Sequence, residues 1–151
     1  MRTEPRVLIV EHNDALRAML FTILRHQPVD VDTAVTAEEA LEKVSQCDYA
    51  LIVVDLDLPN EAGVTFVAKF REERPDVSTF VLAVRDPRNS DTFLDPSNVT
   101  AVLNKPLEID LMAEVVRECA RVVPPPENPL PCPPAESDVR ARMDRGPYLS
   151  N

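Results

Sequence analysis

The most informative segment of the chain, residues 50–59, reads Ala50-Leu51-Ile52-Val53-Val54-Asp55-Leu56-Asp57-Leu58-Pro59. Its five consecutive apolar residues, without polar alternation, are typical of a strand that is buried on both faces. The apolar run ends at Asp55, and a second carboxylate follows two residues later. We therefore expect a central strand of a parallel sheet with two carboxylates at its carboxyl end.

Similar patterns extend outward from this segment in both directions. Further strand-like runs occupy residues 7–10, 29–35, 80–84 and 100–103. Apolar residues recur at helical spacing in residues 14–25, 37–46, 64–74 and 107–122, and a fifth helix is expected after Pro87, where Pro96 and Asn98 interrupt it. Five strands alternating with five helices predict an α/β fold, a doubly wound five-stranded parallel sheet with helices on both faces.

Composition limits the classes of function. The 151 residues include 26 acidic and 16 basic side chains, for a formal charge of −10, which disfavours direct binding to nucleic acid. Only two glycines are present, so no glycine-rich phosphate loop can be written. The three cysteines have no metal-like spacing, and their odd number makes a poor disulfide framework, which indicates a reduced compartment. The sequence also has no signal-like or membrane-spanning apolar run, so we expect a cytoplasmic protein without membrane contact.

Proline is concentrated at the end of the chain. Eight of the fifteen prolines lie in residues 124–151, where few apolar residues are available to pack. Proline favours extended conformations, so we expect a folded domain over residues 5–123 and a disordered or semi-rigid proline-rich tail over residues 124–151.

Polar side chains follow three of the expected strands. Glu11 and His12 come after the first strand, Asp55 and Asp57 after the central one, and Lys105 after the last. In an open parallel sheet the carboxyl ends of the strands form one rim, and ligands bind there. Such a cluster of carboxylates suits a divalent cation with oxygen ligands.

These residues resemble the receiver domain of bacterial response regulators, the phosphoacceptor module of two-component phosphorelay signalling. The resemblance rests on Val7-Leu8-Ile9-Val10-Glu11, on Val53-Val54-Asp55-x-x-Leu58-Pro59-x-x-x-Gly63, and on Lys105-Pro106, which occur in the family's order and spacing over residues 5–123. The resemblance implies a flavodoxin-like fold and a non-enzymatic signalling role, with a histidine kinase or another signalling protein as partner.

The resemblance also implies roles for individual residues. Asp55 is the expected phosphoacceptor, and Lys105 the expected partner of the phosphoryl group. The carboxylates at the rim, Glu11, Asp57 and Asp55, are the candidate ligands of a Mg²⁺ ion, although at the position of Asp57 the family usually contributes only a backbone carbonyl. Among the loop positions Pro59, Gly63 and Pro106, we expect a positive φ at Gly63.

Three positions depart from the family pattern. His12 stands where the family has its direct acidic metal ligand, Ala83 where it has a hydroxyl residue, and Val102 where it has an aromatic switch residue. Imidazole is a poor ligand for Mg²⁺, so Mg²⁺ binding is in doubt. The departures favour a pseudo-receiver with weak or absent phosphorylation of Asp55 that acts by protein–protein contact.

Other hypotheses remain open. The domain could still accept phosphate, with Glu11 and Asp57 holding a metal or with a protonated His12 partly replacing the cation. A transition-metal site of Glu11, His12 and Asp55, and a metal-dependent phosphatase on the same fold, are more remote.

No output domain is expected after residue 123, which indicates a stand-alone receiver that acts through its surface. The expected contact face combines the fourth helix, the last strand and the last helix. It would present Arg88, Asp91 and residues 95–98, and it is also the candidate face for a homodimer.

Overall fold

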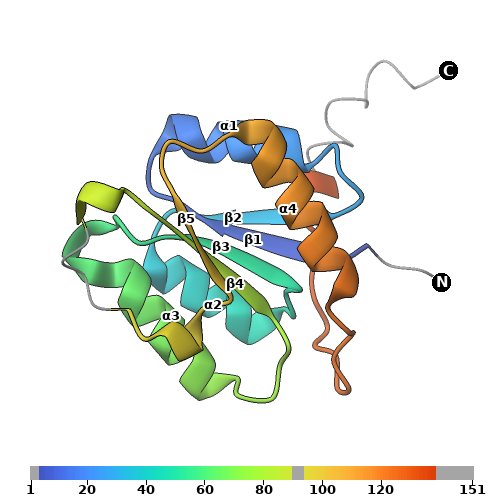
Figure 1. Cartoon of the computed structure of the whole chain (residues 1–151). Helices are drawn as coiled ribbons and strands as arrows, with labels where there is room; N and C mark the ends of the chain where they lie inside the picture. The colour runs from blue at the N-terminus through green and yellow to red at the C-terminus, as the bar shows by residue number, and fades with distance from the viewer. Residues whose placement is uncertain (1–3, 90–93, 139–151) are drawn as a thin grey trace, which may run out of the picture.

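The computed structural model describes residues 4–89 and 94–138 (Figure 1). Its strands are β1 (Arg6–Val10), β2 (Asp30–Ala34), β3 (Leu51–Asp55), β4 (Phe80–Arg85) and β5 (Ala101–Asn104). Its α-helices are α1 (Asp14–Leu24), α2 (Ala37–Gln46), α3 (Ala62–Glu73) and α4 (Ile109–Val122). The strands form one parallel sheet in the order β2-β1-β3-β4-β5, which confirms the predicted flavodoxin-like fold class.

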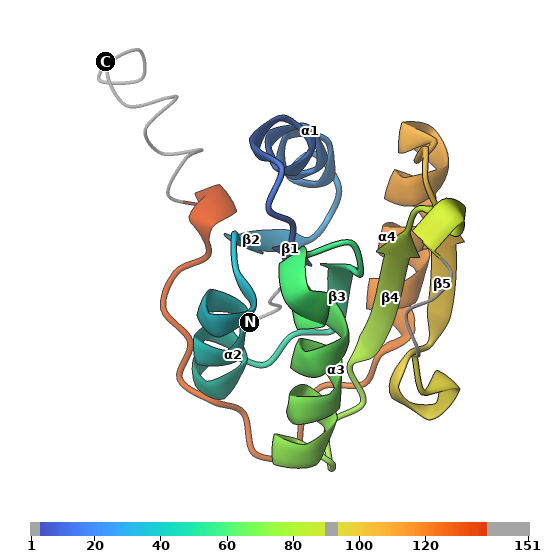
Figure 2. The same ribbon diagram turned by 90° about the vertical axis from the view of Figure 1, so that its left-hand side faces the viewer.

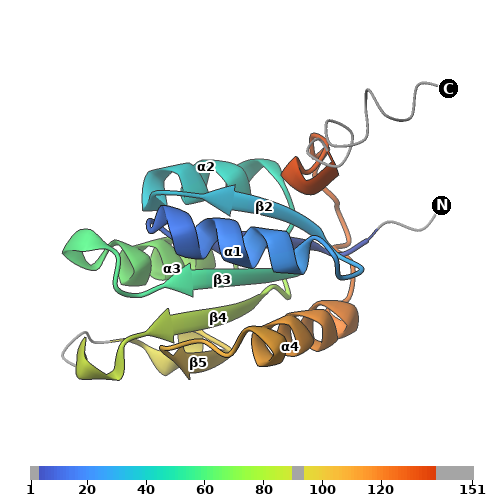
Figure 3. The same cartoon turned by 90° about the horizontal axis from the view of Figure 1, so that it is seen from above.

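Helices cover the sheet on both faces (Figures 2 and 3), with α1 and α4 on one face and α2 and α3 on the other. Alternate residues of the central strands supply the two cores. Leu8, Ile52 and Val54 pack toward α2 and α3, whereas Ile9 and Val53 pack toward α1 and α4. Every residue of β3 is buried, because both of its faces are covered.

The expected fifth helix, between β4 and β5, is not formed in the residues that the structure describes. Two short 3-10 turns, η2 (Pro87–Asn89) and η3 (Pro96–Asn98), stand there instead, and residues 90–93 lie outside the described part. Proline at the start of each turn is compatible with a first helical turn but not with a helix running through it. As a result β5 is largely uncovered, and Val102 is 37% exposed.

The proline-rich region, expected as a disordered or semi-rigid tail over residues 124–151, lies against the domain over the described residues 124–138 (Figure 2). Residues 124–138 run from the end of α4 around the outside of α2 and reach the edge of the sheet beside β2 (Figure 2). Ala135 and Ser137 are buried there. The prediction of a tail over residues 139–151 lies outside the described residues.

Helix α2 begins with a side-chain cap. The Thr36 hydroxyl accepts a hydrogen bond from the Glu39 amide at 3.1 Å, and the Glu39 carboxylate accepts one from the Val35 amide at 2.7 Å. The first contact satisfies an amide that the first helical turn leaves without a partner, and the second satisfies the amide just before the cap.

We expect Thr36→Ala to lower the free energy of unfolding by about 1 kcal/mol, because the capping hydroxyl is lost. Urea unfolding measures the change. Thr65→Ala, at an exposed position of α3, serves as the matched control and should not destabilise the fold. Equal midpoints for the two variants would contradict the assigned cap.

Candidate functional site

The candidate site lies at the carboxyl end of the sheet, where β1 and β3 adjoin. In this strand order the chain continues in opposite directions from β1 and β3, which creates the crevice that open α/β sheets use for ligands. Glu11 and His12 follow β1, and Asp55 is the last residue of β3. Lys105 comes directly after β5 and reaches the same crevice, so the structure brings together the residues singled out from the sequence.

Asp55 is the most enclosed group of the site, with 2% exposure. Its Oδ1 accepts hydrogen bonds from the Asp57 amide at 2.8 Å and from Lys105 Nζ at 3.1 Å. Its Oδ2 accepts no hydrogen bond from the residues described, and lies 3.3 Å from His12 Nδ1. One carboxylate oxygen of Asp55 is therefore held in place, and the other faces an imidazole.

Lys105 bridges two carboxylates. Its Nζ lies 3.1 Å from Asp55 Oδ1 and 3.1 Å from Asp57 Oδ2. Burial disfavours the ammonium ion, but the hydrogen bonds to Asp55 and Asp57 outweigh it and raise the pKa of Lys105 above its ordinary value. The lysine is thus a fixed positive charge beside Asp55.

Asp57 is held by the loop after β4, which the sequence analysis did not connect with the site. Asp57 Oδ2 accepts a hydrogen bond from the Asp86 amide at 2.9 Å, and Oδ1 accepts one from Asn89 Nδ2 at 3.2 Å. Burial alone would raise the pKa of Asp57, but the hydrogen bonds from Asn89, Lys105 and the Asp86 amide hold it below its usual range. Asp86 directly follows β4, a position at the same rim that could have identified it.

Glu11 is 4% exposed, and its Oε2 accepts a hydrogen bond from the Asn13 amide at 3.0 Å. Burial raises the pKa of Glu11 to about 7, and the neighbouring Asp55 carboxylate adds to the effect. The site therefore favours the protonated form of Glu11 beside Asp55.

Because the folded state favours protonated Glu11, its contribution to stability is complete below pH 4.5 and falls as the pH rises toward about 7. We expect urea midpoints in a chelating buffer to decline over this range more steeply for the wild type than for Glu11→Gln. Glu114→Gln, at an exposed position of α4, is the control and should follow the wild type. Parallel curves for the wild type and Glu11→Gln would refute the raised pKa.

A metal ion has one candidate donor set in the described residues: single atoms of Glu11, His12 and Asp55 lie within 4.8 Å of one another. Two carboxylates suit Mg²⁺, but the third donor is an imidazole, which suits Zn²⁺ and other transition metals better. Asp57, the other candidate from the sequence, is engaged by Lys105, Asn89 and the Asp86 amide. This donor set is a poor fit for Mg²⁺.

The two positions at which the sequence analysis expects a departure from the family's switch pattern are paired across adjacent strands. Ala83 on β4 stands in register with Val102 on β5. Ala83 is fully buried and offers no hydroxyl to a group bound at Asp55. Val102, although exposed, has no ring that could exchange between a buried and an exposed position.

The reason for glycine at position 63 differs from the expected one. Gly63 is in helix α3 and does not have a positive φ; the positive values in this loop belong to Asn60, at 59°, and Glu61, at 58°. A Cβ at position 63 would lie 2.4 Å from the backbone oxygen of Asp55. The prediction of a positive φ at Gly63 was therefore wrong, because glycine is needed for the close approach of α3 to the end of β3.

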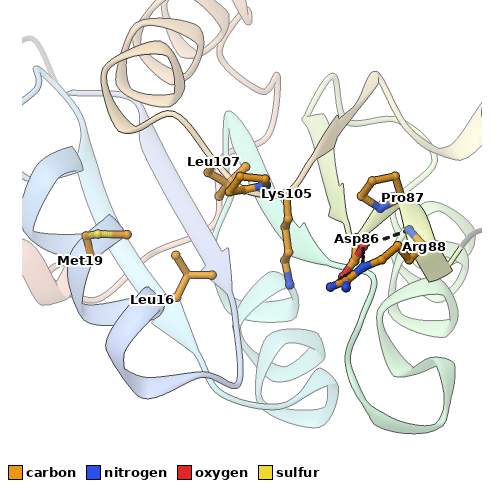
Figure 4. Close-up of a pocket in the computed structure, with 8 residues that line it drawn as sticks. Leu16, Met19, Asp86, Pro87, Arg88, Lys105 and Leu107 are labelled. Atoms are coloured by element: carbon orange, nitrogen blue, oxygen red, sulfur yellow. Dashed lines mark hydrogen bonds and ion pairs between the residues drawn. The ribbon is translucent and has the colours of Figure 1, made fainter.

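The flanking prolines shape the neighbouring loops. Pro59 begins the 3-10 turn η1 (Pro59–Glu61), and Pro106 follows a cis peptide bond after Lys105. Beside the site is an open hollow of about 590 Å³ between α1 and the loop after β4. Lys105 lies between Leu16 of α1 and the Asp86–Arg88 loop (Figure 4), so the hollow adjoins the charged rim.

The family described as the response regulator receiver domain matches residues 7–117. The chain is 35% identical over 80 residues to the two-component response regulator PhoP of Pseudomonas aeruginosa, an alignment that covers 53% of this chain and 36% of PhoP. Among solved structures, a sensor protein from Polaromonas sp. JS666 superposes with a TM-score of 0.68 at 25% identity, covering 79% of this chain and 98% of the other.

A second solved structure shares the fold: response regulator protein TrrA from Thermotoga maritima, in complex with Mg²⁺ and BeF, has a TM-score of 0.66 at 23% identity. The alignment covers 76% of this chain and 98% of TrrA. By contrast, the chain spans only about a third of the length of curated relatives such as PhoP. Among the described residues, no helix is both long enough and apolar enough to cross a membrane.

Proposed function

Because the chain belongs to the response regulator receiver domain family, we propose that it is a signalling module that works mainly through protein contacts. In this proposal Asp55 accepts a phosphoryl group weakly or not at all, and the chain is not an enzyme. Receiver domains interact with histidine kinases and other signalling proteins, and such proteins are the proposed partners. The formal charge of −10 supports protein rather than nucleic-acid contact.

The observation that carries the proposal is the position of His12. Its Nδ1 lies 3.3 Å from Asp55 Oδ2 and 3.5 Å from Glu11 Oε2, so the imidazole contacts both carboxylates. Phosphoryl transfer to a carboxylate requires positive charge to offset the transferring oxygens, and the family resemblance implies that Mg²⁺ supplies it. Imidazole in place of an oxygen ligand supports weak Mg²⁺ binding and a slow reaction.

Ala83 and Val102 support the proposal that the chain works through protein contacts that do not depend on phosphorylation. A modification changes shape only where a neighbouring group responds to it. With neither a hydroxyl at position 83 nor an aromatic ring at position 102, this chain lacks the two groups that the resemblance associates with that response. Contact that does not depend on phosphorylation is therefore the proposed mode of action.

The proposed contact face is formed by β5, α4 and the turns that replace the expected fifth helix. Arg88 stands there with an 88% exposed side chain, held by an ion pair with Asp86 at 2.7 Å. Val102 of β5 and Leu111 of α4 are exposed apolar residues on these elements. Asp91, the other residue expected on this face, lies outside the described residues, and a homodimer through the face remains a proposal.

A functional phosphoacceptor is the second candidate. Lys105 is within 3.1 Å of Asp55 Oδ1, and Asp55 Oδ2 accepts no hydrogen bond from the described residues, as a nucleophilic oxygen requires. The comparisons give no support to the phosphatase hypothesis.

Partner binding distinguishes the two candidates. We expect the proteins captured by the wild type to be captured equally by Asp55→Asn and to be lost with Arg88→Glu. Lys69→Glu, an exposed charge reversal on α3, is the matched control and should retain them. A partner that requires Asp55, or one that tolerates Arg88→Glu, would count against contact-based signalling through this face.

A further inference from the structure

The C-terminal segment, residues 130–137, lies along the free edge of the sheet. Strand β2 is at one end of the strand order, so one of its sides has no strand partner. The segment reaches this side after passing outside α2 (Figure 2). Its entry is fixed at Leu130, whose amide donates to Asp48 Oδ2 at 2.7 Å.

Two side chains of the segment satisfy the exposed amides of β2. Ser137 Oγ accepts a hydrogen bond from the Val31 amide at 2.9 Å, and Glu136 Oε1 accepts one from the Thr33 amide at 2.9 Å. Amides on an edge strand otherwise invite pairing with another strand. The segment therefore closes this edge without forming a strand itself.

Buried groups of the domain recognise the backbone of the segment. Asp32 is 3% exposed, and its Oδ1 accepts a hydrogen bond from the Glu136 amide at 2.9 Å. Its Oδ2 accepts hydrogen bonds from Arg6 Nε and from the Tyr49 hydroxyl, each at 2.7 Å. Arg6 Nη1 in turn donates to the Pro133 oxygen at 2.6 Å, so the Arg6–Asp32 ion pair contacts the backbone of the segment at two points.

The Glu136 side chain enters a complementary cradle, which is formed by Thr33 and Lys43. Its Oε2 accepts a hydrogen bond from Thr33 Oγ1 at 2.9 Å, and its Oε1 lies 2.6 Å from Lys43 Nζ. The flanking side chains are enclosed, with Ala135 2% and Ser137 8% exposed. The surface thus distinguishes a small residue, a carboxylate and a hydroxyl in consecutive positions.

We propose that the flank formed by β2 and α2 is a peptide-binding site, and that residues 130–137 are its intramolecular ligand. The ligand class is a proline-rich segment that ends in Ala-Glu-Ser, with residues 136–138 in a helical turn that the Asp138 amide closes on the Ala135 carbonyl at 3.1 Å. Attachment to α4 gives the segment a high effective concentration, so it occupies the site although its contacts are polar and partly exposed. Its release opens the β2 edge to the same segment supplied from outside.

Release is measured in the full chain by amide hydrogen exchange at Val31 and Thr33. We expect Glu136→Ala combined with Ser137→Ala to accelerate exchange at both amides at least about tenfold, since Thr33 loses a charge-assisted hydrogen bond and Val31 a neutral one. Glu127→Ala removes an equal charge at an exposed position of the same region and should leave exchange unchanged. Unchanged exchange in the double variant would show that these contacts do not hold the segment.

The reactivity of Cys47 provides a second measure of the release of residues 130–137. Burial, together with its contact with Cys132 of the segment, raises the pKa of Cys47 to about 12, so the folded chain presents little reactive thiolate. Alkylation of Cys47 by iodoacetamide should be faster in the double variant than in the wild type. Cys119, on α4, serves as the internal reference.

Binding is then tested with a labelled synthetic peptide of residues 128–138. We expect the peptide to bind the double variant at least about tenfold more tightly than the wild type, whose own segment competes for the site. Adding Lys43→Gln to the double variant should weaken this binding, because the cradle for Glu136 loses its cation. The proposal would be overturned if the double variant did not bind the peptide, or if Lys43→Gln left the affinity for the peptide unchanged.

Discussion

His12→Asp is expected to increase Mg²⁺-dependent phosphorylation of Asp55 by acetyl phosphate roughly 100-fold over the wild type. The substitution removes the imidazole that lies 3.3 Å from Asp55 Oδ2 and supplies an oxygen ligand beside Glu11. A metal ion typically contributes several kcal/mol of transition-state stabilisation, and each 1.36 kcal/mol corresponds to about tenfold in rate. The rate of gain of one phosphoryl mass, measured on the intact protein, tests this expectation.

Two further variants separate the ligand effect from simple removal of the imidazole. His12→Ala opens the same space without adding an oxygen, and we expect it to remain close to the wild type. His12→Asp combined with Asp55→Asn should gain no mass, because the nucleophile is absent. If His12→Asp reacts no faster than His12→Ala, the identity of residue 12 does not control the site.

Gly63→Ala is expected to lower the free energy of unfolding by about 1–3 kcal/mol, the usual range for overpacking. An added Cβ would stand 2.4 Å from the Asp55 backbone oxygen and 3.2 Å from Leu56 Cα. Both neighbours are backbone atoms at the end of a buried strand, so α3 and β3 must separate. Urea unfolding measures the loss.

The sign of this effect is itself diagnostic. Glycine to alanine inside a helix without steric conflict stabilises the fold by roughly 0.5–1 kcal/mol. A stabilising Gly63→Ala would therefore contradict the close approach of α3 to β3. In the variant the added Cβ would press against the backbone oxygen of Asp55. We therefore also expect a change in the chemical shift of the Asp57 amide, which donates to Asp55 Oδ1.

The central architecture could be predicted because its signals are local and redundant. The apolar run before Asp55 has the length and composition of a strand covered on both faces, and the residues that follow β1 and β5 necessarily reach the same rim. The position of Glu11, Asp55 and Lys105 therefore follows from strand order alone. The neighbouring contacts cannot be predicted in the same way. Asn89, for example, donates to Asp57 from a loop whose path no local sequence pattern specifies.

Two features required three-dimensional information. Gly63 was correctly identified as constrained, but spacing cannot distinguish a positive φ from a close helix-to-strand approach. Residues 130–137 have a composition that favours an extended conformation. Composition does not show that the Glu136 carboxylate contacts Thr33 and Lys43, which are about a hundred residues earlier in the sequence. Long-range polar complementarity of this kind arises from the folded surface.

The most direct test of the account is the intact mass of the wild-type chain after incubation with acetyl phosphate and Mg²⁺. With His12 in contact with both Glu11 and Asp55, we predict little or no gain of a phosphoryl group over the time in which His12→Asp is fully modified. Rapid gain of one phosphoryl group by the wild type, abolished by Asp55→Asn, would contradict the proposed weak or absent phosphorylation and identify a working phosphoacceptor.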